Sequence, residues 1–173
     1  MSWTSELLAE HHQLAEFSCG KPELAVWLAS HARRAQRQGT ARVYVWADPD
    51  SGCVVGYYAL APTAVGRAGL PRSATGGVST IPGHLIAKLA LDQSIQGQGL
   101  GTALLLDAIE VVVEASRRAG GRLIVVDAID SAAASFYAAH GFRRLADTNR
   151  WHITVAQAAS LTGTSQDGAI RAP

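Results

Sequence analysis

The residues best suited to chemistry form a glycine-rich run near the middle of the chain. The run consists of Gln96, Gly97, Gln98, Gly99, Leu100, Gly101 and Thr102. It lies between an apolar segment and a long stretch with helical periodicity, which predicts a helix N-terminus with unpartnered N–H groups and partial positive charge. Glycines at three alternate positions remove the Cβ atoms that would keep a phosphate away. This predicts a pyrophosphate-binding turn, although a plain helix cap has a similar composition.

Two common nucleotide motifs do not match this run. The nucleotide P-loop ends in Gly-Lys-Ser/Thr, whereas this run ends in Gly-Leu-Gly-Thr. The dinucleotide fingerprint has two residues between its second and third glycines, and here only Leu100 separates Gly99 from Gly101. The phosphate group that we expect therefore belongs to another class of ligand.

The ionisable residues near the run provide no evident general base. Asp92 ends the apolar segment before the run, and His84 lies in the same segment. Asp127 and Asp130 flank the end of a later apolar segment. Isolated residues of these types usually cap helices or lie satisfied in the core, and none of the four stands out.

The composition is that of a single globular domain. The chain has 173 residues, 48% of them apolar and 17% charged, which is enough to bury a core. The net charge of +1 gives no global attraction to nucleic acid. The basic residues are nevertheless thirteen Arg and two Lys, and because Arg makes planar bidentate contacts with phosphate, local anion sites remain open.

The cysteines bear on the redox compartment, the histidines on metal binding, and the apolar runs on membrane insertion. Cys19 and Cys53 are isolated, which is typical of a reducing cytosol. His11 and His12 have no third ligand nearby in sequence, so we predict no metal. The first residues contain no long apolar run and no stretch is long enough to span a bilayer, so we expect no signal peptide and a cytoplasmic protein without membrane partners.

The first half of the chain is predicted to contain helices followed by a hairpin. Residues 7–17 have the periodicity of a short helix, and a second helix is expected from Pro22 to Gly39. Alternating residues predict strands over 41–47 and 53–61, joined by a turn. Residues 62–83 are rich in Gly and Pro and are predicted to form a loop.

The second half alternates strands and helices. We expect a strand over 84–92, a helix over about 99–119, a buried strand over 122–128 and a helix over 130–140 that stops at Gly141. Two short strands follow at 142–146 and 150–156. The fold class is therefore α/β, a mixed sheet with helices on both faces, in one domain over 1–160 with a flexible tail over 161–173.

Two segments together resemble the GNAT acyltransferases. LALDQSIQGQGLGTALL is similar to that family's acyl-CoA-binding motif, Gln/Arg-x-x-Gly-x-Gly/Ala after a strand. SFYAAHGFRRL is similar to its later helix, which ends in aromatic-Tyr-x-x-x-Gly-Phe, and the two motifs have the expected separation. The resemblance covers residues 5–157 and implies the GNAT fold, with acetyl-CoA as cosubstrate.

The resemblance assigns roles to particular residues. The turn that includes Gln96 and Gly97 binds the CoA pyrophosphate through N–H groups, and the preceding strand pairs with the pantetheine arm. The implied N–H donors are Gln98, Gly99, Leu100, Gly101 and Thr102, and the implied strand residues are Leu89, Ala90 and Leu91. Tyr137 would protonate the leaving thiolate, and because thiols and phenols have similar pKa values the transfer would be nearly balanced. Without the motif, Tyr137 would be interpreted as a core aromatic.

The N-terminal part resembles a narrower group. FSCGKPELAVWL is similar to the Phe-x-Cys-Gly-x-x-x-Leu-x-x-Trp-Leu of GNAT toxins from type II toxin–antitoxin systems, which acetylate the amino acid on charged tRNA and block translation. This implies aminoacyl-tRNA as substrate, a ribbon-helix-helix antitoxin as partner, and a homodimer. An esterified α-amine is largely neutral at cell pH, so water would suffice as its base.

Seven arginines are candidates for tRNA contacts. They are Arg33, Arg34, Arg37, Arg67, Arg72, Arg143 and Arg144. The alternative is an ordinary solvated basic face.

Two other functions stay open on the sequence. A GNAT enzyme of the same fold could acetylate a small amine or a protein N-terminus, which fold alone does not distinguish from a toxin. A non-catalytic CoA-binding module is the alternative of another class, and Tyr137 with the intact glycine turn argues against it.

Overall fold

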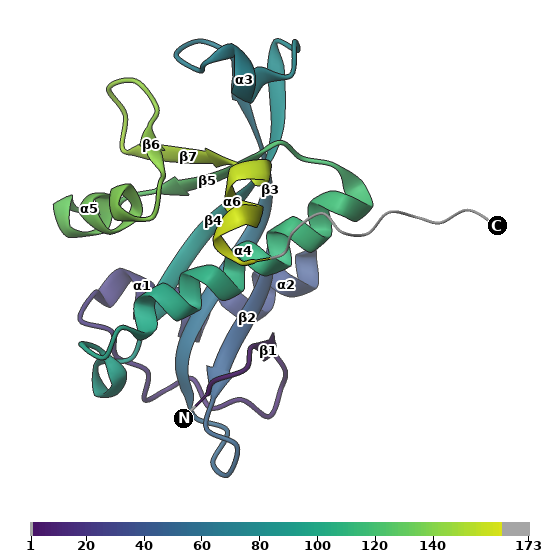
Figure 1. Cartoon of the computed structure of the whole chain (residues 1–173). Coiled ribbons are helices and arrows are strands. Elements are labelled where there is room, and N and C mark those ends of the chain that lie inside the picture. Colours follow the sequence, from purple (N-terminus) through teal and green to yellow (C-terminus); the bar gives the residue numbers. More distant parts are fainter. Residues whose placement is uncertain (1, 164–173) are drawn as a thin grey trace.

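The computed structural model describes residues 2–163, which form a seven-stranded sheet with helices on both faces. The strands are β1 (Glu6–Leu7), β2 (Arg42–Ala47), β3 (Val54–Gly66), β4 (Thr80–Leu91), β5 (Leu123–Asp127), β6 (Arg143–Arg144) and β7 (Arg150–Thr154). Their order is β1-β2-β3-β4-β5-β7-β6 (Figure 1). Only β4 and β5 pair in parallel, so the sheet is mixed, as predicted.

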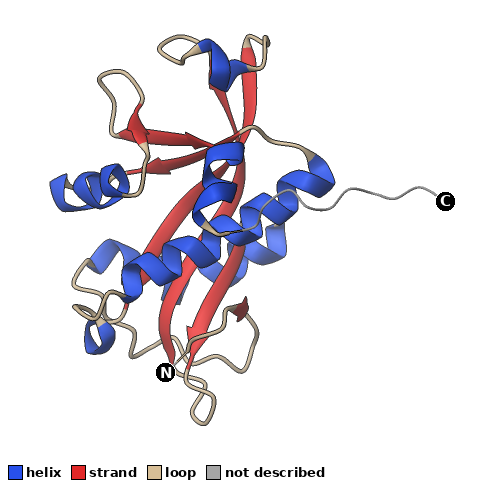
Figure 2. Cartoon of the chain, in the orientation of Figure 1, coloured by secondary structure: helices blue, strands red, loops and turns tan. Residues whose placement is uncertain are grey.

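The helices cover both faces of the sheet (Figure 2). They are α1 (Pro22–Ser30), α2 (Ala32–Gln38), α3 (Arg72–Thr75), α4 (Leu100–Ala119), α5 (Ser131–Ala139) and α6 (Val155–Leu161), with a 3₁₀ turn at Gln93–Ile95. Buried residues of α4, α5 and α6 form one core cluster with Tyr58, Ile86 and Val126 of the sheet. Buried residues of α1 and α2 form a second cluster with Val43 and Tyr57.

The pairing of β4 with β5 is short, and the two strands then separate. Their parallel register runs only from Gly83–Leu123 to Ile86–Val126. A bulge follows at once, because Ala59 pairs with Lys88 and Leu60 with Ile86, which leaves Ala87 unpaired. Residues 87–91 of β4 keep β3 as a neighbour but no longer have β5 beside them. The edge of β4 that leads into the glycine turn therefore has no partner strand among the described residues, and its Leu91 carbonyl accepts from the Gln96 side chain.

Several local predictions are confirmed. Strands β2 and β3 form the expected hairpin, whose turn is held by the Asp48 carboxylate accepting from the N–H groups of Asp50 and Ser51. Helix α4 spans almost the predicted range. Helix α5 begins at Asp130, whose carboxylate accepts from Ala133 N–H, and the chain turns at Gly141 with φ +86°.

The predicted helix over 7–17 is wrong. Glu6 and Leu7 pair with β2 instead, and the Leu8 N–H donates to the Val43 carbonyl. The apolar side chains that suggested a helix, including Leu14 and Phe17, are buried against the α1 side of the sheet. A segment that buries its apolar residues against the sheet can therefore show a helix-like spacing of those residues without forming a helix.

Two further boundaries differ from expectation. The predicted helix over 22–39 is two helices that meet at His31, with Ala32 fully buried just after the break. The predicted loop over 62–83 is mostly strand, since β3 and β4 stay paired from Pro62–His84 out to Gly66–Thr80. This long hairpin is stabilised by a third core cluster, which joins its Val65, Ile81 and Ala74 to β5 and to Leu145.

Helix α6 was missed because residues 150–156 alternate as a strand does. The strand ends at Thr154, whose side chain accepts from Gln157 N–H in a capping box. Thr-x-x-Gln was the available signal. Ala158 of α6 is fully buried in the core, with 0% of its surface accessible to water. The predicted flexible tail begins within α6, and residues 164–173 of it lie outside the described part of the chain.

Candidate active site

The glycine turn has the geometry expected of a phosphate site. Gly97 and Gly99 have φ values of +76° and +75°, which residues other than glycine rarely adopt. Gly99 is the N-cap of α4, and no side chain caps the helix in its place. A Cβ at either glycine would meet no described atom within 4 Å. Open N–H groups at a helix N-terminus fit a pyrophosphate.

The N-terminal segment holds this turn in place through hydrogen bonds. Ser18 N–H donates to the Asp92 carboxylate at 2.8 Å, and Gln93 N–H donates to the Ser18 carbonyl at 2.8 Å. The Gln96 side-chain amide donates to the carbonyls of Cys19, at 3.0 Å, and Leu91, at 2.8 Å. The Gln96 side chain, predicted as part of the cofactor-binding turn, therefore holds the shape of that turn.

Asp92 is a cap rather than a base. Burial opposes its ionisation, but the hydrogen bonds from the N–H groups of Ser18 and Ser94 outweigh burial and lower the pKa of its carboxyl. A carboxylate with a lowered pKa and two backbone donors is a poor proton acceptor.

Helix α5 packs directly on the glycine turn. The Phe136 ring lies 3.7 Å from the position that a Cβ would take at Gly101. The Thr102 hydroxyl lies 3.0 Å from Nε2 of His140, the residue that ends α5. The structure thus brings together the turn and the helix that carries Tyr137, two motifs that the sequence separates. His140 was missed at the sequence level, although it directly precedes Gly141 of the aromatic motif.

Tyr137 is 7% exposed and lies between two other rings. The centroids of Phe136 and Phe142 are 5.4 and 5.6 Å from its own. Its hydroxyl has no hydrogen-bond partner among the described residues, and the hydroxyl oxygen is not completely buried. Burial, with a smaller contribution from the charge of Asp127, raises the pKa of Tyr137 to about 12. The phenol therefore stays protonated and has a free donor.

The predicted pantetheine strand lies on the free part of β4. Leu89 and Leu91 pack with the α4 cluster, and Ala90 between them packs with the α1 cluster. On the α1 side, Lys88 Nζ lies 5.5 Å from the ring centre of Trp27. Lys88 and Trp27 were not singled out from the sequence, since nothing local marks two residues so far apart.

The other candidate bases are all engaged. His84 Nε2 lies 3.0 Å from the Gly120 carbonyl. Asp127 accepts two hydrogen bonds from Arg150, at 2.8 and 2.9 Å. The hydrogen bond from Lys21, at 2.6 Å, lowers the pKa of Asp130, which also caps α5. His84, Asp127 and Asp130 therefore take part in structural contacts.

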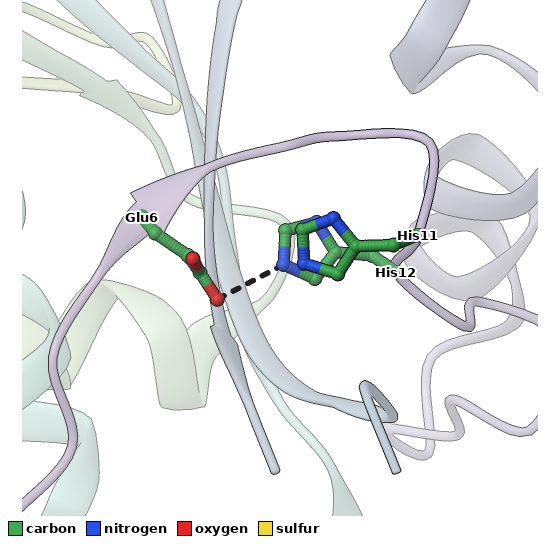
Figure 3. A group of neighbouring side chains, drawn as sticks. All are labelled: Glu6, His11 and His12. Atoms are coloured by element: carbon green, nitrogen blue, oxygen red, sulfur yellow. Dashed lines mark hydrogen bonds and ion pairs between the residues drawn. The ribbon is translucent and has the colours of Figure 1, made fainter. Parts of the chain in front are cut away.

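A third group lies beside His11 and His12 after all (Figure 3). The possible ligand atoms of these residues and Glu6 lie within 4.8 Å of one another. However, Nδ1 of His12 accepts from Ala9 N–H at 2.9 Å, so the ring proton is on Nε2, 3.0 Å from Glu6 Oε1. A metal on Nε2 would shift that proton to Nδ1, against the Ala9 N–H. These contacts favour a structural role, in which the hydrogen bonds of His12 hold the N-terminal segment in place.

Two of the seven candidate tRNA arginines form hydrogen bonds within the fold. Arg33, expected on an exposed helix face, is half-buried and donates to three main-chain carbonyls, the closest being that of His12 at 2.7 Å. Arg144 donates to the Thr148 carbonyl at 2.7 Å. The guanidinium groups of the other five are exposed and form no hydrogen bond or ion pair within residues 2–163. These five, the unpaired arginines, are Arg34, Arg37, Arg67, Arg72 and Arg143.

The unpaired arginines divide into two groups. Arg67 and Arg72 lie at the tip of the β3–β4 hairpin, and Arg143 lies on β6, whose following residue Leu145 shares a core cluster with Ala74 of that tip. Residues 34 and 37 belong to α2, which packs on β2. Four strands separate β2 from β6 in the sheet, a distance of about 24 Å at ordinary strand spacing.

Comparison with known proteins agrees with this geometry. A family model described as an acetyltransferase (GNAT) domain matches residues 39–144. The chain is 35% identical over 147 residues to a tRNA-acetylating toxin of Mycobacterium tuberculosis, covering 84% of this chain and 87% of that protein.

Two solved structures of the AtaT toxin are also similar. One is AtaT complexed with acetyl-methionyl-tRNAfMet, with a TM-score of 0.85, 30% identity, and coverage of 92% of this chain and 99% of that one. The other is a tyrosine-to-phenylalanine variant of AtaT bound to acetyl-CoA and the C-terminus of the antitoxin AtaR. Its TM-score is 0.79 at 29% identity, with coverage of 91% of this chain and 96% of that one.

The chain therefore belongs to the GNAT acetyltransferases, and it is an N-acetyltransferase that uses acetyl-CoA. Within this family, the relatives reported above are toxins that act on, or are complexed with, tRNA. Among residues 2–163, no helix combines the length and apolar character needed to cross a membrane.

The first prediction concerns the turn. Replacing Gly99 with Glu puts a carboxylate and a strained backbone where the phosphates are expected, so acetyl-CoA binding measured by calorimetry should be lost. Gly120→Glu is the matched control, because Gly120 also has a positive φ and open space but lies at the other end of α4. Equal affinity in both variants would place the donor site elsewhere.

Proposed function

We propose that this enzyme is a toxin that transfers the acetyl group of acetyl-CoA to the α-amine of an aminoacyl-tRNA and so blocks translation. The observation that carries the proposal is the packing of α5, with its free Tyr137 hydroxyl, on an open glycine turn at the end of a β4 edge without a partner strand. The tRNA-acetylating toxin among its relatives supports the choice of substrate.

The turn and the free β4 edge divide the work of holding acetyl-CoA. The N–H groups from Gln98 to Thr102 bind the pyrophosphate, and the main chain of Leu89, Ala90 and Leu91 pairs with the pantetheine amides. Acetyl-CoA supplies the acetyl group as a thioester. In this arrangement the pantetheine arm would bring the thioester to Tyr137.

Tyr137 donates to the thiolate as the thioester breaks. Its pKa of about 12 changes the energetics predicted from the sequence, because an ordinary thiol has a pKa of about 8.5 and full proton transfer from the phenol is therefore uphill. A hydrogen bond to sulfur, which strengthens as negative charge develops there, is the favourable form of this catalysis.

The acceptor amine needs little help to lose its proton. A free α-amino group has a pKa of about 8, and esterification of its carboxyl lowers that value further. Asp92, Asp127 and Asp130 are occupied by hydrogen bonds or ion pairs, so water is the base that we propose. A Lys side chain, with a pKa of about 10.4, would be a poor substrate under these conditions.

The unpaired arginines are the part of the surface that we assign to tRNA. A guanidinium without a protein partner can bind a phosphate without giving up another contact. The hairpin tip and β6 carry one group, and α2 carries the other. Their separation suits two places on one extended nucleic acid rather than a single pocket.

A toxin of this kind needs a partner that restrains it. We propose a ribbon-helix-helix antitoxin whose disordered tail folds on this domain, a homodimer as the assembled state, and the cytoplasm as its location. The complex of the similar protein AtaT with the C-terminus of its antitoxin supports the presence of an antitoxin partner.

The second prediction tests catalysis. Tyr137→Phe keeps the ring but removes the donor, so the rate of aminoacyl-tRNA acetylation should fall by about 10²–10⁴-fold and growth inhibition should be lost, with acetyl-CoA affinity retained. Tyr44→Phe is the control, since Tyr44 is a half-buried β2 tyrosine whose hydroxyl also has no hydrogen-bond partner within residues 2–163.

The pH dependence of the same variant gives a further check. Because the pKa of Tyr137 lies well above neutrality, the phenol is protonated throughout the working range, and the rate ratio of wild type to Tyr137→Phe should be the same at each pH. An alkaline decline that disappears in the variant, or near-normal turnover in it, would return Tyr137 to a packing role.

The third prediction tests the tRNA surface. Arg67→Glu with Arg72→Glu, and separately Arg34→Glu with Arg37→Glu, should slow tRNA acetylation and flatten its salt dependence by about one unit of slope for each lost phosphate contact. Arg118→Glu is the control, because its 80% exposed side chain pairs with Glu114 instead. Wild-type acetylation that barely responds to salt would contradict phosphate recognition by either group.

A further inference from the structure

His140 connects the end of α5 to the first turn of α4. Its Nδ1 lies 2.7 Å from the Phe136 carbonyl, and its Nε2 lies 3.0 Å from the Thr102 hydroxyl. The ring also packs on Phe136, with centroids 4.6 Å apart, and is half-buried. These contacts hold the imidazole in one orientation beside the turn.

The contacts determine where the protons are. A carbonyl can only accept, so Nδ1 of His140 carries a proton and donates it to Phe136. In the neutral ring Nε2 is then an acceptor, and the Thr102 hydroxyl must donate to it. The hydroxyl proton therefore points toward His140 and is withheld from a ligand at the turn.

Protonation of His140 reverses this hydrogen bond. Nε2–H then donates to the Thr102 oxygen, and the hydroxyl proton becomes free to donate elsewhere. Thr102 is the third residue of α4 after the Gly99 cap, so its hydroxyl accompanies the first-turn N–H groups. A phosphate oxygen at the turn is the acceptor that this released proton suits best.

We propose that His140 and Thr102 form a positioning pair that takes up one proton from solvent when acetyl-CoA binds. This inference rests on the proposed function, because it places the pyrophosphate at the glycine turn. The proton goes to Nε2 of His140, and the Thr102 hydroxyl turns from His140 to a pyrophosphate oxygen. Donor binding is thus coupled to proton concentration through a residue outside the glycine motif.

The charges around His140 agree with this direction. The first two turns of α4 (100–106) contain no ionisable residue, the ionisable residue of α5 (131–139) is Tyr137, and Arg143 and Arg144 follow on β6. A bound pyrophosphate adds negative charge next to the His140 ring, and negative charge favours the imidazolium over the neutral ring.

Calorimetry of acetyl-CoA binding at one near-neutral pH, in two buffers of different ionisation enthalpy, measures the protons exchanged. We expect net uptake by the wild type. Thr102→Val should abolish the uptake and weaken binding about tenfold, the scale of one hydrogen bond to a charged group, while Thr102→Ser should restore both. His140→Gln offers a permanent amide donor, so it should retain affinity and lose the proton uptake.

The outcomes separate this inference from the proposed function. Tight binding by the wild type without proton uptake, or uptake that persists in Thr102→Val or His140→Gln, would overturn the positioning pair and leave the acetyltransferase assignment intact. No acetyl-CoA binding by the wild type would overturn both. Far-UV circular dichroism of each variant identifies any loss of affinity that comes from unfolding.

Discussion

The short pairing between β4 and β5 is the constraint on which the site depends. The strands are parallel neighbours over four residue pairs, and the bulge at Ala87 then directs β4 away while β3 continues to support it. Free main-chain groups on a strand are a liability unless something pairs with them. Here that edge leads straight into the glycine turn, and the contacts that we propose for acetyl-CoA would use both parts, the edge for the pantetheine amides and the turn for the phosphates.

The turn keeps its open form because other segments carry its structural contacts. Ser18 and Cys19 hold it through Asp92 and Gln96, and α5 covers its far side through Phe136 and His140. The N–H groups of the first turn of α4 are thereby spared for a ligand. The same division applies to the arginines, since Arg33 anchors the N-terminal segment and its neighbour Arg34 stays unpaired. Similar sequence context therefore does not imply a similar role.

Chemistry at the site follows from burial more than from charge. Tyr137 lies among aromatic rings, which keeps its phenol protonated and leaves a free donor. The carboxylates around it are held in caps and ion pairs, so they steady the elements rather than accept protons. Such a site suits an amine that is already partly neutral, and this is the property that an esterified α-amine has.

The sequence by itself determined the features that depend on neighbours along the chain. The glycine turn, the β2–β3 hairpin and the Asp130 cap of α5 could be predicted, because each is formed by backbone preferences and hydrogen bonds within a few residues. Only the tertiary structure decided that residues 7–17 form no helix, that Arg33 is bound, and that Thr102 meets His140 from 38 residues away. These outcomes depend on burial and on partners from distant segments, and local residue patterns carry no information about either.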